Sequence, residues 1–492
     1  MELTTILVAI AVFLIVFAWF RRPNPRLPPC PKSPLPVVGH LFYMSRDARP
    51  QFKGFRKRCG DMYSLYLGDA LVVVLNGYEL IKEALVKRAD VFSDRPPFFI
   101  DMATGIPGKG VVFSNGHTWK EQRSVSLSIL RAFGMGKNLL AERIQEEAGF
   151  LMNHLASHKG EPIDTRIMTN ISTSNVICSI LIGHRFEYHD KDFQDLMYRM
   201  GCLVSDQQMV SLVNFIPWLR HIPGDFFQAK RITANVQALM QMLNKFIVEK
   251  RRHIEDSNEV CNLIDAYTIE KNKKIQSGMP TSLDDESLMK IMFELFIAGT
   301  ETTSTTIYWC LLYMLHNPNV QEKVHQEIKE KIGTNRAPTI QDKTQLVYLN
   351  AVIKETQRLG SIVPLGVTHM CSEEVTLRGY TLPKGTYILP SLDSVLHEKA
   401  TWGEDASSFR PERFIDGDGK LLVPEEFIPF GTGRRVCLGE AIAKMELFLF
   451  LAHMFQRFEF LPPAPGEVPP IKYEVGGVLA PKPYKIRIVD RK

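Results

Sequence analysis

The chain has 492 residues, enough for one very large domain or two to three ordinary ones, and 45% of them are hydrophobic. Its formal net charge of +5 is mild, and no basic run is interleaved with aromatic residues, so we expect no nucleic-acid partner. The eight cysteines form no CxxC pair, which argues against a zinc finger or a disulfide framework and favours a reducing compartment.

The N-terminus has the features of a membrane anchor. Residues 3–20, LTTILVAIAVFLIVFAWF, carry no charge and precede Arg21 and Arg22. As a helix this run would span ~27 Å, about one hydrocarbon core. A cleaved signal peptide would carry its positive charge before the apolar run. Positive flanks stay cytosolic, so residues 1–22 are predicted to anchor a cytosolic protein. An uncleaved signal and a buried helix are the alternatives.

Seven prolines between residues 23 and 36 exclude a helix there and favour stiff polyproline II. We interpret residues 23–36 as a spacer between the anchor and the folded part, with a disordered linker as the alternative. Residues 37–492 contain no second linker and no internal repeat, so one catalytic domain is expected.

Hydrophobic periodicity within residues 37–492 predicts a large α-rich domain with minor sheet. Strand-like runs occur at 62–77, 374–390 and 484–489. The helical patterns lie at 117–132, 138–157, 168–181, 229–252, 284–315, 319–331, 345–359 and 438–456.

The longest helical pattern, 284–315, is apolar nearly all round and is therefore predicted to cross the protein interior. Ser282 followed by Asp285 resembles a capping box, and Pro318 ends the helix. A second membrane span is the alternative, which three charged residues oppose: Lys290, Glu294 and Glu301.

The middle of this helix reads AGTETT, residues 298–303. Gly299 costs about 1 kcal/mol of helix propensity and lets another group approach the backbone. With Glu301 and Thr302 beside it, the segment suggests a reaction chamber. Close helix packing at Gly299 is the alternative.

Cys437 lies in the glycine-rich stretch FIPFGTGRRVCLGEAIAKME, residues 427–446. A nucleophilic cysteine needs a His base, and none is near in sequence, although folding could supply a distant one. No partner cluster for a tetrahedral metal appears. A thiolate bound to haem iron needs only one cysteine, because the porphyrin supplies the other ligands.

Phe430, Gly433, Arg435, Cys437 and Gly439 match FxxGxRxCxG, the haem-binding signature of the cytochromes P450. The chain resembles this family over nearly its whole length, and PLPVVGH and SLSILRAFGMGK are similar to microsomal family 2. The resemblance implies the cytochrome P450 fold, with a long central helix over haem b, and Cys437 as the axial ligand of its iron.

The resemblance also implies roles for other motifs. Thr302, with Glu301, would deliver protons for oxygen activation. The ExxR motif supplies Glu355 and Arg358, and FRPERF supplies Arg413; the resemblance implies that these three form a buried structural trio. The three-residue spacing of Glu355 and Arg358 alone suggests a surface ion pair. The family pattern places further haem contacts at Arg95, Trp119, Arg123, Ala298, His369, Phe430, Arg435 and Gly439, of which the Arg, Trp and His residues would bind the propionates.

Three departures from the family pattern weaken assignment to a subfamily: Thr368 where Pro is usual, Gln357 where Leu is common, and Ser124-Val125 where Arg-Phe is usual. By family analogy, substrate contacts would be Phe98, Ile106, Val112, Phe113, Phe296, Ala298, Ile362, Val363, Val367 and Val478. They are overwhelmingly apolar, so the substrate is expected to be lipophilic: a fatty acid, a steroid or a xenobiotic.

The expected function is monooxygenation, with one atom of O2 inserted by hydroxylation or epoxidation. NADPH–cytochrome P450 reductase would supply the electrons, with cytochrome b5 as a second candidate, at the endoplasmic reticulum membrane. No GxGxxG follows a strand, so NADPH is expected to bind the reductase. Candidate docking residues are Lys120, Arg131, Lys137 and Lys444. The alternatives are a hydroperoxide isomerase or dehydratase without a reductase, and a non-catalytic haem sensor or lipid carrier.

Overall fold

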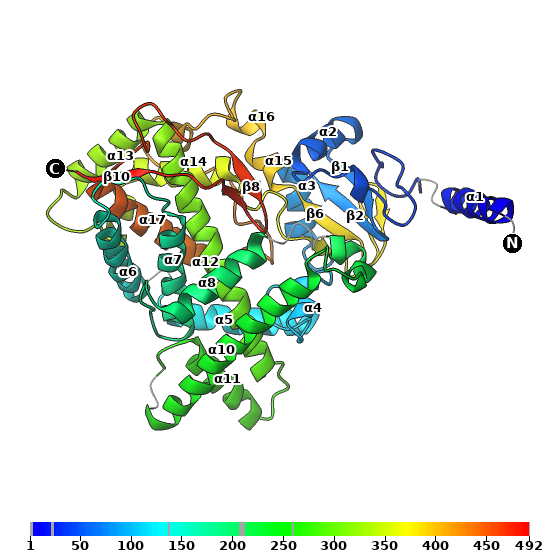
Figure 1. Ribbon diagram of the computed structural model, residues 1–492, viewed down its shortest axis with the longest axis horizontal. Coiled ribbons are helices and arrows are strands. Elements are labelled where there is room, and N and C mark those ends of the chain that lie inside the picture. The colour runs from blue at the N-terminus through cyan, green and yellow to red at the C-terminus, as the bar shows by residue number, and fades with distance from the viewer. Residues whose placement is uncertain (1–2, 21–23, 136–137, 206–211, 258–259, 492) are drawn as a thin grey trace.

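Helices form most of the chain in the computed structural model, which describes residues 3–20, 24–135, 138–205, 212–257 and 260–491 (Figure 1). The shorter helices are α2 Arg49–Cys59, α3 Tyr78–Lys82, α4 Phe99–Ala103, α11 Leu263–Gln276, α15 Leu392–Leu396 and α16 Lys399–Trp402. The longer ones are α1 Leu3–Phe20, α5 Gly116–Ala132, α6 Asn138–Ala156, α7 Arg166–Leu181, α8 Lys191–Ser205, α10 Ala229–Ser257, α12 Asp285–His316, α13 Pro318–Lys331, α14 Val347–Gly360 and α17 Glu440–Arg457. The predicted mainly α fold is confirmed.

The strands are short and lie in small sheets. They are β1 Met62–Leu67, β2 Ala70–Leu75, β3 His369–Met370, β4 Val375–Leu377, β5 Tyr380–Leu382, β6 Tyr387–Pro390, β7 Phe458–Leu461, β8 Tyr473–Val475, β9 Leu479–Pro481 and β10 Arg487–Asp490. The largest sheet has the order β1-β2-β6-β3, with β2 parallel to β6 and the other pairs antiparallel. Pairing of β3 with β6 sets His369 opposite Ile388, which fixes the loop that precedes β3.

The longest helix, α12, runs through the middle of the helical body, packed against α7, α10, α14 and α17 (Figure 1). Every residue from 303 to 315 is buried, so this half of the helix has no solvent-exposed face. That burial explains the apolar pattern and places α12 in the core, as predicted. Ala298, in the preceding turn, is accessible.

The start of α12 differs from the prediction that Ser282 caps it. The helix begins at Asp285, and its N-cap is Asp284, whose side chain accepts a hydrogen bond from the Ser287 N–H. Ser282 lies before the cap, and both its N–H and its hydroxyl donate to Glu121. Because Glu121 occupies the Ser282 N–H and hydroxyl, Asp284 caps the helix, and the predicted cap lies two residues too early.

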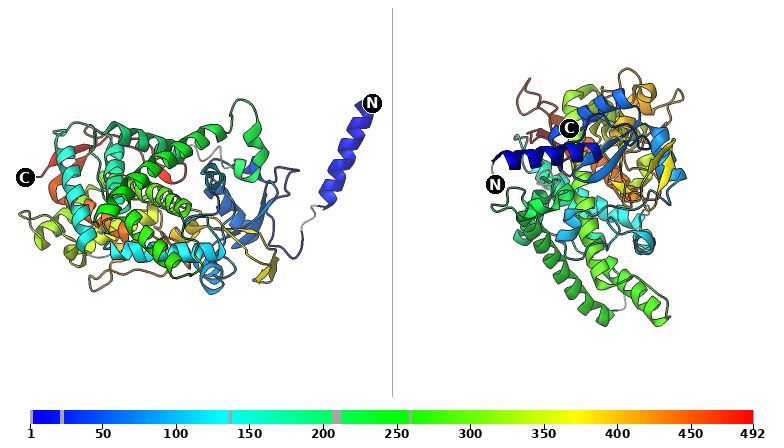
Figure 2. Two further views of the ribbon diagram at one scale, coloured as in Figure 1. Left: turned by 90° about the horizontal axis from the view of Figure 1, so that it is seen from below. Right: turned by 90° about the vertical axis from the view of Figure 1, so that its right-hand side faces the viewer.

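The N-terminal helix α1 stands apart from the body in Figure 1 and in the left view of Figure 2. Across the described ranges, no helix is long and apolar enough to cross a membrane. Residues 24–36 form no helix, as their prolines require, and their backbone lies against β1: the Ser64 N–H donates to the Pro29 carbonyl at 3.0 Å.

Candidate functional site

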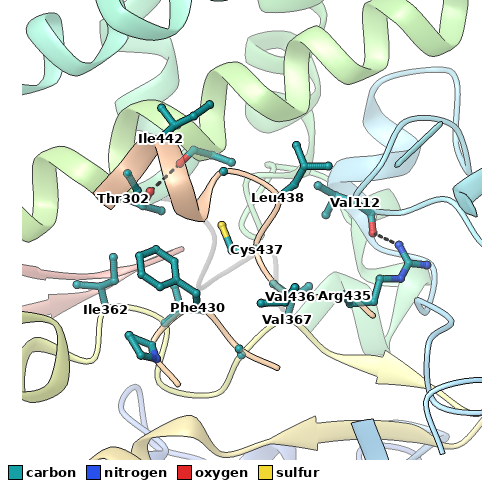
Figure 3. Close-up of a pocket in the computed structure, with 18 of the residues that line it drawn as sticks. Val112, Thr302, Ile362, Val367, Phe430, Arg435, Val436, Cys437, Leu438 and Ile442 are labelled. Atoms are coloured by element: carbon teal, nitrogen blue, oxygen red, sulfur yellow. Dashed lines mark hydrogen bonds between the residues drawn. The ribbon is translucent and has the colours of Figure 1, made fainter. Parts of the chain in front are cut away.

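A cavity of about 350 Å³ lies in the core. It is bounded by the middle of α12, the loop after α14, the loop that contains Cys437 and the first turns of α17. Figure 3 shows Cys437 at the centre of this space, with Thr302 and Ile442 to one side and Val112 and Arg435 to the other. Segments far apart in sequence therefore meet around one thiol.

The loop before α17 presents Cys437 to the cavity. The Cys437 N–H donates to the Phe430 carbonyl at 3.0 Å, which closes the loop. Gly433 has φ 79°, and a Cβ there would lie 1.9 Å from the Leu85 carbonyl oxygen. Only glycine fits this position, which explains one of the glycines in the stretch.

The thiol of Cys437 is accessible from the cavity although protein surrounds the residue. Burial raises its pKa, while the Gly439 N–H and the nearby Arg123 guanidinium lower it. A cation placed against the sulfur would favour the thiolate. Within the described part of the chain, no group of three or more His, Cys, Asp or Glu side chains is arranged to hold a metal ion.

One face of α12 lines the cavity with residues four apart: Glu294, Ala298 and Thr302. The Thr302 hydroxyl donates to the Ala298 carbonyl at 2.8 Å. A Cβ on Gly299 would lie 2.4 Å from Ile177 of α7. The alternative of close helix packing therefore explains this glycine, while the accessible backbone beside it still borders the cavity.

The two acids of this segment have different surroundings. Glu301 is absent from the cavity lining in the described structure, and Asn170 Nδ2 donates to its carboxylate at 3.3 Å. Glu294 lines the cavity, and its Oε2 accepts from the Val111 and Val112 N–H groups at 2.6 and 3.0 Å. Burial raises the pKa of Glu294 to about 7. Its spacing from Ala298 and Thr302 was the sequence signal that could have identified it.

Three guanidinium groups and one imidazole lie at one side of the cavity, and burial, followed by the charge of Arg95, lowers the pKa of the His369 imidazole well below its ordinary value. Arg95, Arg123, His369 and Arg435 line the cavity, and the Arg435 guanidinium lies 4.0 Å from the centre of the Trp119 ring. Burial, followed by the charge of Arg95, lowers the pKa of Arg435 to about 8. Burial and Arg123 lower the pKa of Arg95 to about 9.

The partners of these cations are neutral. Each donates to backbone carbonyls: Arg95 to Val367 and Thr368, Arg123 to Val436, and Arg435 to Ser93 and Ser114. Arg95 Nε and Trp119 Nε1 are buried without a hydrogen-bond partner in the described structure. Asp94 and Glu294 act on the Arg435 guanidinium only through their charge. Buried guanidinium groups bonded to neutral oxygens, with spare N–H donors beside them, fit a ligand that carries carboxylates, such as the two propionates of haem.

Glu355, Arg358 and Arg413 meet in a buried ion network. Glu355 and Arg358 are fully buried, with Nε–Oε2 and Nη2–Oε1 distances of 2.7 and 2.9 Å. Arg413 Nε lies 2.9 Å from Glu355 Oε1. Arg358 also donates to the Leu396 carbonyl, and the Arg410 N–H donates to Glu355. The surface ion pair that spacing alone suggests is therefore wrong.

The residues predicted to touch substrate divide into two sets. Those that line the cavity are Val112, Ala298, Ile362, Val363 and Val367. Those outside its described lining are Phe98, Ile106, Phe113, Phe296 and Val478. Phe98 and Phe113 pack on each other with ring centres 5.5 Å apart, and Phe296 is buried in the core. Val478 precedes Leu479, whose N–H donates to the Ile362 carbonyl.

Several lining residues were not predicted. The lining contains the predicted Phe430, Cys437 and Gly439. The residues beside them that were not predicted to line it are Thr303, Gln357, Ser361, Leu438, Ile442 and Glu446. Of the predicted docking residues, Lys120 and Arg131 are exposed, Lys444 pairs with Glu440, and Lys137 lies outside the described residues. Spacing along α17 does not reveal that Glu446 faces α12 rather than solvent, so no sequence signal singled it out.

Comparisons with known proteins agree with this geometry. The family profile described as Cytochrome P450 matches residues 28–488. Cytochrome P450 2U1 of Homo sapiens is 39% identical over 510 residues, covering 98% of this chain and 92% of that protein. Cytochrome P450 2B4 of Oryctolagus cuniculus is 39% identical over 490 residues, covering 98% of this chain and 97% of that protein.

Proposed function

The chain belongs to the cytochrome P450 family and is a haem monooxygenase, and from this premise we propose which residues perform the reaction and on what. Cys437 is the thiolate ligand of haem b. The observation that carries this assignment is that the accessible thiol of Cys437 shares one cavity with the buried guanidinium groups of Arg95, Arg123 and Arg435, whose hydrogen bonds in the described structure go to neutral oxygens.

Haem, when bound through a thiolate, supplies oxygen activation assisted by electron donation from the sulfur. The residues of this chain hold it in place. Arg95, Trp119, Arg123, His369 and Arg435 bind its carboxylates, and Phe430, Gly439 and Ala298 pack on its faces. Charge-assisted hydrogen bonds to the propionates would offset the repulsion among the guanidinium groups.

Thr302 is the proton-delivering residue at the cavity wall. Its hydroxyl can accept a proton from one side and donate one on the other, while its bond to the Ala298 carbonyl fixes its rotamer. Glu301 is the acid behind it. Burial raises the pKa of Glu301, so this carboxyl, which accepts from Asn170 outside the described lining, keeps its proton to a higher pH than a free glutamate.

The substrate is a lipophilic molecule, because the cavity is walled chiefly by apolar side chains such as Val112, Ile362 and Val367. One atom of O2 enters the substrate, and the other leaves as water with two protons and two electrons. NADPH supplies the electrons through a flavoprotein reductase, with cytochrome b5 as a second donor. The docking face includes the exposed Lys120 and Arg131 and the half-buried Lys444.

The protein is held at the endoplasmic reticulum membrane through residues 1–22, with residues 23–36 as a spacer. The proposal rests on the uncharged run at 3–20 and the arginines that follow it. Truncation before residue 23 should move the protein from the microsomal to the soluble fraction.

Thr302→Val tests the proton-delivery role. We expect product formation in a reconstituted system with reductase, NADPH and a screen of fatty acids, steroids and drug-like compounds to fall about 100-fold. The consumed electrons should appear as hydrogen peroxide. Thr300→Val is the matched control, because Thr300 makes the same hydrogen bond four residues back but lies outside the described cavity lining. Equal rates in both variants would remove Thr302 from the mechanism.

The same system separates the alternatives. A hydroperoxide isomerase would turn over a fatty-acid hydroperoxide without NADPH, and a haem sensor or lipid carrier would give no product under either condition.

A further inference from the structure

The hydroxyl of Thr303 makes a different hydrogen bond from those of its neighbours on α12. Other hydroxyls of this segment donate to the carbonyl four residues earlier in the same helix: those of Thr300, Thr302, Ser304 and Thr306. Thr303 Oγ1 donates instead to Oε2 of Glu446 on α17, at 2.9 Å. This bond joins α12 to the helix that directly follows Cys437.

Glu446 lies in surroundings that do not suit a charge. Glu446 is 1% exposed, and the residues before and after it on α17, Met445, Leu447 and Phe448, are buried as well. Oε1 is buried without a hydrogen-bond partner in the described structure, and both Glu446 and Thr303 line the cavity. Burial raises the pKa of Glu446 to about 8, with the Thr303 hydroxyl as the opposing contribution. At neutral pH the side chain is therefore chiefly a neutral carboxylic acid that accepts from Thr303.

The bond lies between the two sides of the site. Thr303 is adjacent to Thr302 on α12, and Glu446 is on α17, whose first residue, Glu440, lies three positions after Cys437. Both helices are rigid at these positions, because their surrounding residues are buried in one core. A hydrogen bond of fixed length between them therefore constrains how far Thr302 can move relative to Cys437.

We propose that Glu446 is a positioning residue: by holding Thr303, it sets the placement of Thr302 relative to Cys437. The inference rests on the proposed roles of Cys437 and Thr302. The group that positions Thr302 is a neutral hydrogen-bond acceptor, so an amide of the same shape should serve in its place.

The experiment compares Glu446→Leu, Glu446→Gln, Thr303→Val and the double variant Thr303→Val/Glu446→Leu with the haem-loaded wild type. The readout is the rate at which O2 reoxidises the reduced protein, followed by absorbance, without substrate or reductase. Each rate is taken on the fraction that shows the thiolate-shifted carbon-monoxide band, so misfolded protein does not contribute. Thr302→Val gives the reference change, and Thr300→Val is the control.

We expect Glu446→Leu and Thr303→Val each to change the rate at least fivefold, in the direction of Thr302→Val. The double variant should match either single variant within twofold, because both remove the same bond. Glu446→Gln and Thr300→Val should stay within twofold of wild type. A merely structural role would lower the yield of haem-loaded protein without changing this rate.

Three results would overturn the inference. The first is a Glu446→Leu rate within twofold of wild type while the Thr302→Val rate differs. The second is a Glu446→Gln rate as altered as that of Glu446→Leu, and the third is a double variant whose rate change is the product of the two single changes. A wild type without the thiolate-shifted band would instead refute the proposed function. An unaltered rate in Thr302→Val would refute the role of Thr302, and the inference would fall with it.

Discussion

Glu355→Gln is expected to lower the free energy of unfolding and, with it, to abolish most of the yield of folded protein. Glu355 is fully buried and accepts hydrogen bonds from Arg358, Arg413 and the Arg410 N–H. The amide removes the negative charge but leaves the Arg358 guanidinium fully buried. Removing one partner of a buried ion pair costs about 3–5 kcal/mol. Domains are stable by only about 5–15 kcal/mol, so this loss is a large part of the total.

The measurement is chemical denaturation of the haem-loaded proteins, with the yield of soluble protein beside it. The matched control is Glu322→Gln, because Glu322 pairs with Arg491 at 2.8 Å but its side chain is 51% exposed. Exposed pairs contribute less than about 1 kcal/mol. A free energy of unfolding for Glu355→Gln that equals that of the control would show that the network does not stabilise the fold.

Arg435→Met is expected to weaken haem retention far more than it weakens the haem-free chain. In the loaded protein it removes a charge-assisted hydrogen bond worth about 1.5–3 kcal/mol, so the dissociation constant should rise by about 10- to 100-fold. In the haem-free chain the substitution removes the Ser93 and Ser114 contacts and the attraction of Asp94 and Glu294. It also removes the cost of burying the guanidinium and its repulsion from Arg95 and Arg123, so the loss is partly offset.

Haem transfer to a haem-scavenging protein measures the retention, and denaturation of the haem-free chain measures the second effect. Arg434→Met is the control, because Arg434 is the exposed neighbour of Arg435 and is absent from the described cavity lining. Equal transfer rates for the two variants would show that the buried cations do not hold the propionates.

Much of the fold could be predicted from the sequence because its long helices are strongly periodic. The pattern at 284–315 became α12, Asp285–His316, with a shift of one residue at each end. Shorter or more polar helices were missed, among them α2, α8 and α11. α11 contains five charged residues (one aspartate, one glutamate and three lysines) in LIDAYTIEKNKKIQ, so its apolar stripe is narrow and tertiary packing decides its conformation.

The sequence predicted the site well where a motif determines the shape of the backbone. It predicted the site poorly where the direction of a side chain determines whether that residue faces the cavity. Gly433 and Cys437 belong to a loop whose shape its glycines dictate. Glu301 and Glu294 are both on α12, but only Glu294 lines the cavity in the described structure. Helical spacing from Thr302 separates the two: Glu294 lies two intervals of four residues away, whereas Glu301 is the adjacent residue.

Burial is the property that sequence reasoning could least supply. The spacing of Glu355 and Arg358 is the same on a surface helix as on a buried one, and only the packing of α14 against its neighbours puts both at 0% exposure. The five apolar residues outside the described cavity lining show a related limit, and their contact with substrate stays a prediction. Phe98, Phe113 and Phe296 are as suited to core packing as to substrate contact.

The assignment of Cys437 as the haem thiolate is tested most directly by a carbon-monoxide difference spectrum of the reduced protein, with Cys437→Ala measured beside it. The wild type should show the thiolate-shifted band, and Cys437→Ala should lose it while any retained haem absorbs at the position of a haem without a thiolate ligand. A wild type without that band, or a Cys437→Ala variant that keeps it, would contradict the account.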